Sequence, residues 1–363
     1  MATTDSSEQY YDRAKAVKEF DDAKIGVRGL LDSGITTIPR FFIHPPENLT
    51  CLRSTHPVAI QIPTVDLSDL YSNSARSQII QQIRDAASEF GFFQIINHGI
   101  SVSIMDNTIS AVRAFHELPA VEKKQHYNRT YEGGVFYATN YDLFRAKAAT
   151  WRDTLGVQTA PVPPNWERVP AICRTEFMEW CRQMAKLGEV LAQVLCEGLG
   201  LQQDRLKEIK CLNSSGTVAH CYPYCPQPDL TLGVSSHTDP FLLTILMQDE
   251  VGGLQAKIGE NWIDIKPIHG ALVINIGDFL EIISNGMYKC VEHRVLANSL
   301  QRSRLSIATL IGPNHKENSD TFGPLPELLS EDKPALFRNF SMSEFMAKFL
   351  GKGLSIMVDN FKL

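Results

Sequence analysis

Two residues of metal-binding type stand two positions apart in the segment VSSHTDP, at His237 and Asp239. In a β-strand, residues i and i+2 point to the same face, so the imidazole and the carboxylate would face a common point. This arrangement suits chelation of a metal ion. The pair alone is weak evidence, because a hydrogen-bonded pair at the surface has the same spacing.

A further histidine, His293, lies in YKCVEHRVLAN between Val291 and Val295 on one face of a predicted strand. A histidine flanked by two valines on its own face is expected to point inward. The alternative is a buried core histidine with a backbone partner. Taken with the first pair, His293 completes a set of two imidazoles and one carboxylate, which is typical of non-haem Fe(II) sites with open coordination positions.

A possible anion site follows at Arg304 and Ser306, which alternate onto one face with Ala308, Leu310 and Gly312. A buried arginine requires an anionic partner, and its planar fork best fits a carboxylate. Tyr222 is predicted to lie inward on a strand with Val218 and His220, so its hydroxyl could reach the same anion. The alternative is an ion pair with a distant carboxylate of the chain. No second inward Lys or Arg is expected.

The composition excludes several classes of protein. The 363 residues carry a net charge of −6, with 44% hydrophobic and 21% charged residues, which is ordinary for a soluble globular protein. There is no basic stripe for nucleic acid and no long apolar run for a membrane span. The polar N-terminus lacks the features of a secretory signal, so a cytoplasmic location is expected. The eight cysteines form no CxxC pair, which argues against a zinc ribbon.

The predicted elements change in character along the chain. Helical periodicity is longest from 174 to 199, whereas short alternating runs between 215 and 312 indicate an antiparallel sandwich or small barrel. FFQII at 92–96 predicts a strand, and Ser341 with Glu344 predicts the start of a last helix. We divide the chain into five segments: an N-terminal helical extension (1–59), a mixed α/β region (60–170), a long supporting helix (171–215), a β core (216–313) and a C-terminal segment with a lid helix (314–363).

Together these motifs resemble the plant 2-oxoglutarate and Fe(II)-dependent dioxygenases. The resemblance extends over most of residues 60 to 340 and includes EFGFFQIINHGI, YPYCPQPDLTLGVSSHTDP, YKCVEHRVLAN and RLSIATLIGP. The opening KEFDDAKIGVRGLLDSGITTIPRFFIHP is similar to the branch of 1-aminocyclopropane-1-carboxylate oxidase homologues and deacetoxyvindoline 4-hydroxylase.

The resemblance implies a fold, a site and a reaction. The fold would be a mainly β core, a double-stranded β-helix (jelly roll, cupin-like), wrapped by N-terminal and C-terminal α-helices. His237, Asp239 and His293 would bind Fe(II), whereas 2-oxoglutarate would be held by Arg304 and Ser306, with Tyr222 as hydroxyl partner. The reaction would consume O2, release succinate and CO2, and use ascorbate as reductant. His220 and Cys221 depart from the Asn and the aromatic residue found in many relatives.

The substrate side is predicted from side-chain type alone. Because Gly312 leaves room and no second inward cation is expected, we predict a small, mostly apolar plant specialised metabolite as the partner of a monomeric enzyme. Hydroxylation is the expected outcome; desaturation, ring closure and O-demethylation are alternatives. The candidate pocket residues, each of which could equally serve core packing, are Phe136, Tyr137, Phe241, Leu310, Gly312, Phe345 and Phe349.

Other functions share parts of this pattern. An ascorbate-dependent oxidase of the ethylene-forming type keeps the same motifs but does not use 2-oxoglutarate. A non-catalytic, cupin-like small-molecule binder would have no need for the full ligand set. A zinc hydrolase is disfavoured because the chain has no HExxH arrangement that would supply a general base.

Overall fold

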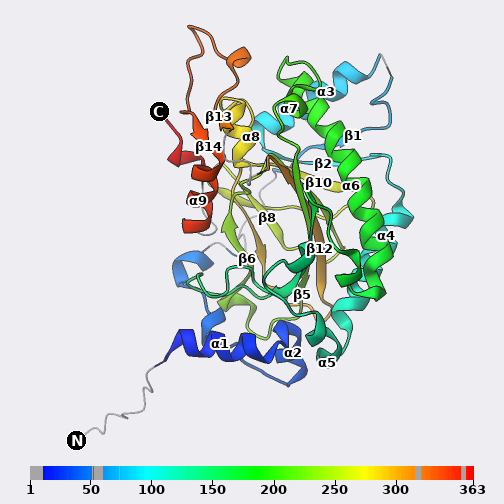
Figure 1. The fold of residues 1–363 in the computed structure, drawn as a ribbon, viewed down its shortest axis with the longest axis vertical. Coiled ribbons are helices and arrows are strands. Elements are labelled where there is room, and N and C mark those ends of the chain that lie inside the picture. Colours follow the sequence, from blue (N-terminus) through cyan, green and yellow to red (C-terminus); the bar gives the residue numbers. More distant parts are fainter. Residues whose placement is uncertain (1–10, 51, 53–59, 73, 315–319, 353–356) are drawn as a thin grey trace, which may run out of the picture.

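The structure is a computed structural model that describes residues 11–50, 52, 60–72, 74–314, 320–352 and 357–363 (Figure 1). Its centre is a pair of β-sheets. The larger sheet has eight strands in the order β1 (Thr64–Asp66), β2 (Phe92–Ile96), β10 (Leu272–Ile276), β7 (Leu243–Gln248), β12 (Arg304–Gly312), β5 (Ser214–Tyr222), β4 (Asp153–Ala160) and β3 (Val135–Thr139). The smaller sheet has four strands in the order β6 (Leu232–His237), β11 (His293–Leu296), β8 (Leu254–Ile258) and β9 (Asn261–Asp264).

Antiparallel register fixes which side chains lie next to each other. In the larger sheet Arg304 pairs with Tyr222 and Ser306 with His220. In the smaller sheet His293 pairs with His237. Since side chains alternate across a strand, the predicted co-substrate residues share one face of the larger sheet, and the two histidines lie side by side on the smaller one.

Helices cover the rest of the core, as Figure 1 shows for α6 and α4 beside the large sheet. The apolar side chains of α6 form one continuous cluster with those on the outer face of β12. Gly188 of α6 permits this close approach, since a Cβ there would lie 2.2 Å from the side chain of Ile311. The helices are α1 (Arg13–Ala23), α2 (Gly26–Asp32), α3 (Arg76–Glu89), α4 (Val102–Glu117), α5 (Ala120–Lys123), α6 (Ala171–Gly198), α7 (Arg205–Glu208), α8 (Asp278–Ile283) and α9 (Met342–Lys352).

The predicted jelly-roll core with helices at both ends is confirmed. Strand 92–96 matches β2, and the last helix, α9, follows Ser341, whose hydroxyl accepts a hydrogen bond of 3.2 Å from the Glu344 N–H. The long helix begins at Ala171 rather than 174. A short pair of strands, β13 (Thr321–Phe322) and β14 (Phe340–Ser341), precedes α9.

The larger sheet extends beyond the predicted core of 216–313. Its strands β1, β2, β3 and β4 come from residues 64 to 160, and β4 pairs directly with β5. The five-segment division of the chain stays a prediction, as do the monomeric state and the cytoplasmic location. Within the described residues, no helix combines the length and apolar character needed to cross a membrane.

Candidate active site

The three predicted metal ligands converge where the smaller sheet ends. His237 is the last residue of β6 and His293 the first of β11, and their ring centroids are 4.2 Å apart. Oδ1 of Asp239 lies 3.6 Å from Nε2 of His237 and 3.8 Å from Nε2 of His293. One ligand atom from each residue therefore lies within 4.8 Å of the other two, a spacing that can hold a metal ion.

Neighbouring groups orient the three side chains. Nδ1 of His237 is 2.9 Å from the Ser235 carbonyl and Nδ1 of His293 is 3.2 Å from the Val291 carbonyl, which leaves both Nε2 atoms facing Asp239. These contacts assign the proton to Nδ1, so Nε2 carries the lone pair that a metal requires.

The second oxygen of Asp239 is held by two residues that the sequence reasoning missed. Oδ2 accepts hydrogen bonds of 2.5 Å from the Thr244 hydroxyl and 2.8 Å from the Asn275 amide. Both donors are buried, on β7 and β10 of the larger sheet. The carboxylate is therefore fixed with Oδ1 turned toward the histidines.

The protonation states of the three candidate ligands suit the binding of a cation. Burial alone would raise the pKa of Asp239, but the two imidazoles and the Thr244 hydroxyl hold its pKa well below the ordinary value. Burial, together with the neighbouring His237, lowers the pKa of His293 to about 4. At neutral pH the cluster thus presents a carboxylate and a neutral His293 imidazole, the protonation states in which these side chains bind metals.

Arg304 is buried without a carboxylate partner among the described residues. Its side chain is 1% exposed, Nη1 donates to the Ser306 hydroxyl at 3.1 Å, and Nη2 donates to Oε1 of Gln248 at 2.9 Å. The guanidinium lies 4.8 Å from the centroid of the Tyr222 ring, and Nε has no hydrogen-bond partner in the described part of the chain. Neutral acceptors do not neutralise the guanidinium, so the described residues contain no internal ion pair of Arg304.

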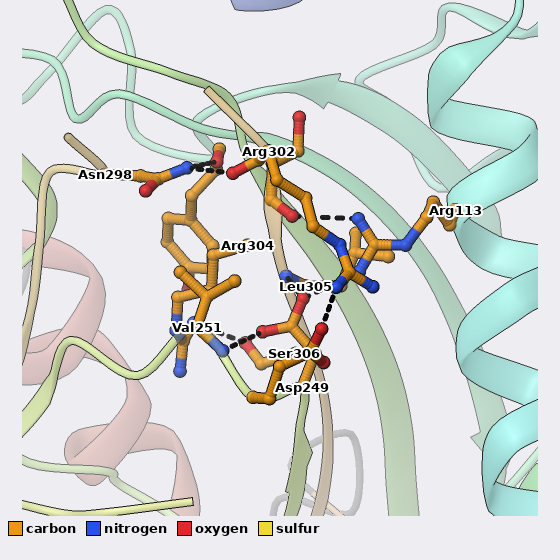
Figure 2. Close-up of polar contacts among 11 residues, drawn as sticks. Arg113, Asp249, Val251, Asn298, Arg302, Arg304, Leu305 and Ser306 are labelled. Carbon is orange, nitrogen blue, oxygen red and sulfur yellow. Dashed lines mark hydrogen bonds and ion pairs between the residues drawn. The ribbon is translucent and has the colours of Figure 1, made fainter. Parts of the chain in front are cut away.

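A second network holds the start of β12 in place (Figure 2). Asp249, directly after β7, accepts a hydrogen bond of 2.8 Å from Arg113 of α4 and one of 2.7 Å from the Leu305 N–H. Arg113 also donates to the Ser303 carbonyl at 2.8 Å. The backbone on both sides of Arg304 is thus fixed by residues that do not enter the cavity.

A cavity of about 500 Å³ between the sheets contains these groups. It is lined by all three candidate metal ligands and by Arg304, Ser306 and Tyr222. Of the predicted pocket residues, Phe241, Leu310 and Phe349 line it as well.

Four predicted pocket residues lie elsewhere, and their placement at the cavity is corrected. Tyr137 packs on Phe115, with ring centroids 4.9 Å apart. Phe136 is 3% exposed and packs against the Tyr131 ring at 4.3 Å, so that Tyr131 lines the cavity in its place. The other two are absent from the cavity lining. Phe345 packs among Phe279, Phe340 and Phe361. Gly312 lies against the Phe241 side chain, since a Cβ there would be 3.2 Å from Cδ1 of Phe241.

The structure also corrects the expectation that no second cation points inward. Arg152 is 8% exposed and lines the cavity. It shares the inward face with Thr154, whose hydroxyl is 2.9 Å from Nδ1 of His220. Burial, with Arg152 and Arg304 nearby, holds the pKa of His220 well below its ordinary value. The alternation of Arg152, Thr154 and Gly156 is the sequence signal that marks this inward face.

Comparisons with known proteins agree with this geometry. Residues 213–313 match the 2OG-Fe(II) oxygenase superfamily, and residues 62–175 match the family described as non-haem dioxygenase in morphine synthesis N-terminal. The chain is 43% identical to 1-aminocyclopropane-1-carboxylate oxidase homolog 1 of Arabidopsis thaliana, over 94% of each chain. It is 45% identical to homolog 5 of the same plant, over 95% of this chain and 87% of the relative.

Solved structures show the same fold. The structure of JOX2 in complex with 2OG, Fe and JA matches with a TM-score of 0.80 and 28% identity, over 93% of this chain and 98% of that one. The 2-oxoglutarate complex of dioxygenase for auxin oxidation 1 from Arabidopsis thaliana matches with a TM-score of 0.61 and 29% identity, over 76% of this chain and 100% of that one. The chain therefore belongs to the 2OG-Fe(II) oxygenase superfamily of oxidoreductases, which use Fe(II) and 2-oxoglutarate, and it groups with the plant 1-aminocyclopropane-1-carboxylate oxidase homologues.

Proposed function

We propose that this protein is a 2-oxoglutarate-dependent dioxygenase that hydroxylates a small plant metabolite with a largely apolar body. His237, Asp239 and His293 would bind Fe(II), and Arg304, Ser306 and Tyr222 would bind 2-oxoglutarate. The observation that carries the proposal is the buried, uncompensated guanidinium of Arg304 in the same cavity as the histidine and carboxylate cluster.

The donor set fits Fe(II). Two imidazole nitrogens and one carboxylate oxygen form a facial set that leaves coordination positions for other ligands. When bound, Fe(II) and 2-oxoglutarate would activate O2, which is the oxidant, and the co-substrate would leave as succinate and CO2. The residues of the chain contribute orientation, through the hydrogen bonds that fix Asp239 and the two imidazoles.

The anion site fits the far carboxylate of 2-oxoglutarate. A carboxylate next to Arg304 would supply the negative charge that its neutral acceptors lack, and it could accept from Nε, which has no partner among the described residues. Ser306 lies beside it as a hydroxyl donor, and the Tyr222 ring, stacked against the guanidinium, restricts its orientation. Arg304 and the three candidate metal ligands line one cavity. The proposed co-substrate would therefore lie in the same cavity as the metal site.

The rest of the cavity supports an apolar substrate body. Its lining includes residues that cannot donate hydrogen bonds from their side chains, on both sheets, in the segment between β6 and β7, and on α9: Phe92, Val218, Val234, Phe241, Leu246, Leu254, Val295, Leu310, Met346 and Phe349. Such a surface excludes water from a reactive centre and positions a C–H bond by shape. Hydroxylation is the simplest result of oxidation at such a bond.

The test is an assay of anaerobically purified protein with Fe(II), ascorbate and 2-oxoglutarate, read as succinate release. We expect release that requires 2-oxoglutarate and that is lost in His237→Ala together with bound iron. An ascorbate-dependent oxidase would turn over without 2-oxoglutarate, and a non-catalytic binder would release no succinate, so either result would reject the proposal. Mass shifts of plant metabolite extracts would then separate hydroxylation from desaturation and demethylation.

A further inference from the structure

Arg152 is the second buried cation of the active-site cavity. It immediately precedes β4, whose register with β5 places Thr154 opposite His220 on the inward face. Arg152 also lines a neighbouring, polar cavity of about 640 Å³, which shares Tyr141 and Phe349 with the active-site cavity. The guanidinium therefore stands where the two cavities meet.

The hydrogen bonds of Arg152 leave its charge uncompensated. Nη1 donates to the Thr150 hydroxyl and to the Gly233 carbonyl, each at 2.9 Å, and both acceptors are neutral. Nε is buried without a partner, and no carboxylate of the described chain lies within ion-pair distance of the guanidinium. A side chain that is 8% exposed has little water to replace that partner.

The proposed cofactors do not supply the missing charge. Asp239 is the one acid among the described residues that line the active-site cavity. The one negative charge of Asp239 and the two negative charges of 2-oxoglutarate would balance the two positive charges of Fe(II) and the one positive charge of Arg304. The charge of Arg152 then remains without a counter-charge among the described residues that line this cavity.

We propose that Arg152 binds the carboxylate of the substrate that is oxidised, so that the substrate class is small carboxylic acids with an apolar body. The inference rests on the proposed function and names its substrate class. One planar guanidinium matches a carboxylate, whereas a phosphate dianion would call for more donors than this part of the lining offers. The apolar lining then receives the body of the acid, and the ionic contact fixes which carbon faces the metal cluster.

The experiment measures binding to the protein loaded with Fe(II) and 2-oxoglutarate under anaerobic conditions. The probes are aryl- and cycloalkyl-alkanoic acids, such as 3-phenylpropanoic acid, each paired with its methyl ester. Calorimetry should show that acids bind more tightly than their esters. Arg152→Met should weaken the acids about tenfold to a hundredfold and leave the esters unchanged, as expected for loss of one charge-assisted contact. Arg152→Lys, which keeps the charge, should bind the acids with an affinity between those of the wild type and of Arg152→Met.

The matched control is Arg145→Met, which removes a cation that lines the neighbouring, polar cavity but not the active-site cavity. Acid affinity should stay at the wild-type level in this variant. The inference is wrong if no acid binds more tightly than its ester, or if Arg152→Met weakens acid and ester alike. It is also wrong if Arg152→Met weakens 2-oxoglutarate itself, because Arg152 would then serve the co-substrate. Failure of the proposed function is distinct, since it would appear as absence of iron binding or of 2-oxoglutarate-dependent succinate.

Discussion

The Asp249 carboxylate accepts a hydrogen bond of 2.7 Å from the backbone N–H of Leu305, the residue that follows Arg304. The same carboxylate pairs with Arg113, and its side chain is only 1% exposed. Gln248, the residue before Asp249, accepts from Arg304 itself. Two consecutive residues thus hold Arg304 in place, Gln248 through the arginine side chain and Asp249 through the backbone N–H that follows it.

Replacing Asp249 with Asn should destabilise the protein by about 3 kcal/mol, because it leaves Arg113 partly buried without its counter-charge. Urea unfolding followed by circular dichroism would measure the loss. The control is Arg302→Gln, which breaks an ion pair with Glu250 whose side chains are 57% and 63% exposed. That change should cost less than about 1 kcal/mol. Equal losses in both variants would contradict a structural role for the buried pair.

Arg304→Gln should weaken 2-oxoglutarate binding about tenfold to a hundredfold, since a charge-assisted contact is replaced by a neutral one. The dependence of succinate release on 2-oxoglutarate concentration, and anaerobic titration of the Fe(II)-loaded protein, would both report the change. Arg302→Gln again serves as control, two positions away and exposed. An unchanged affinity in Arg304→Gln would remove this residue from the co-substrate site.

Asn275→Ala should lower metal affinity by about tenfold, because Asp239 loses one of the two donors that orient its carboxylate. Competition of Fe(II) or Co(II) with a colorimetric chelator would give the dissociation constants. Thr217→Val is the matched control. It removes a buried hydrogen bond of 2.9 Å to Thr309 that does not touch the site, and it should leave metal affinity as it is. Metal affinity that falls equally in both would point to general loosening of the core.

His116 should make the protein sensitive to acid. Burial, assisted by Lys123, lowers its pKa from 6.5 to about 3. Below pH 6.5 the unfolded chain takes up a proton at this residue and the folded chain does not. Stability should therefore fall by about 1.4 kcal/mol per pH unit from this residue as the pH drops toward 3. His116→Phe keeps a ring against Phe115 and should show a correspondingly shallower decline in urea unfolding at stepped pH values. Parallel curves for wild type and variant would refute this assignment.

The sequence revealed the site where strand alternation is strongly marked. The order Arg304, Ser306, Ala308 and Leu310 places polar and apolar side chains on one face, and the structure keeps them in one cavity. The convergence of His237 and Asp239 with His293 follows from the same period of two, applied to segments that pair in the smaller sheet.

Other features depend on pairings that a single sequence does not contain. Tyr137 and Phe345 are aromatic, and aromatic side chains serve cores and pockets equally well, so type alone does not separate the two. Arg152 becomes informative only once β4 is known to pair with β5. Thr244 and Asn275 reach Asp239 from the larger sheet, across the space between the sheets, and no local pattern marks such contacts.

The pairing of β2 with β10 also bears on how the chain reaches its native state. Ile95 and Leu272 are register partners although they are far apart in sequence. The β2–β10 pair can therefore form only after most of the chain has been synthesised. Such high contact order favours slow folding. A fragment limited to 213–313 would expose the free edges of β5 and β10, which β4 and β2 cover in the whole protein. Exposed edges of this kind recruit other strands, so aggregation rather than an isolated catalytic domain is the expected fate of that fragment.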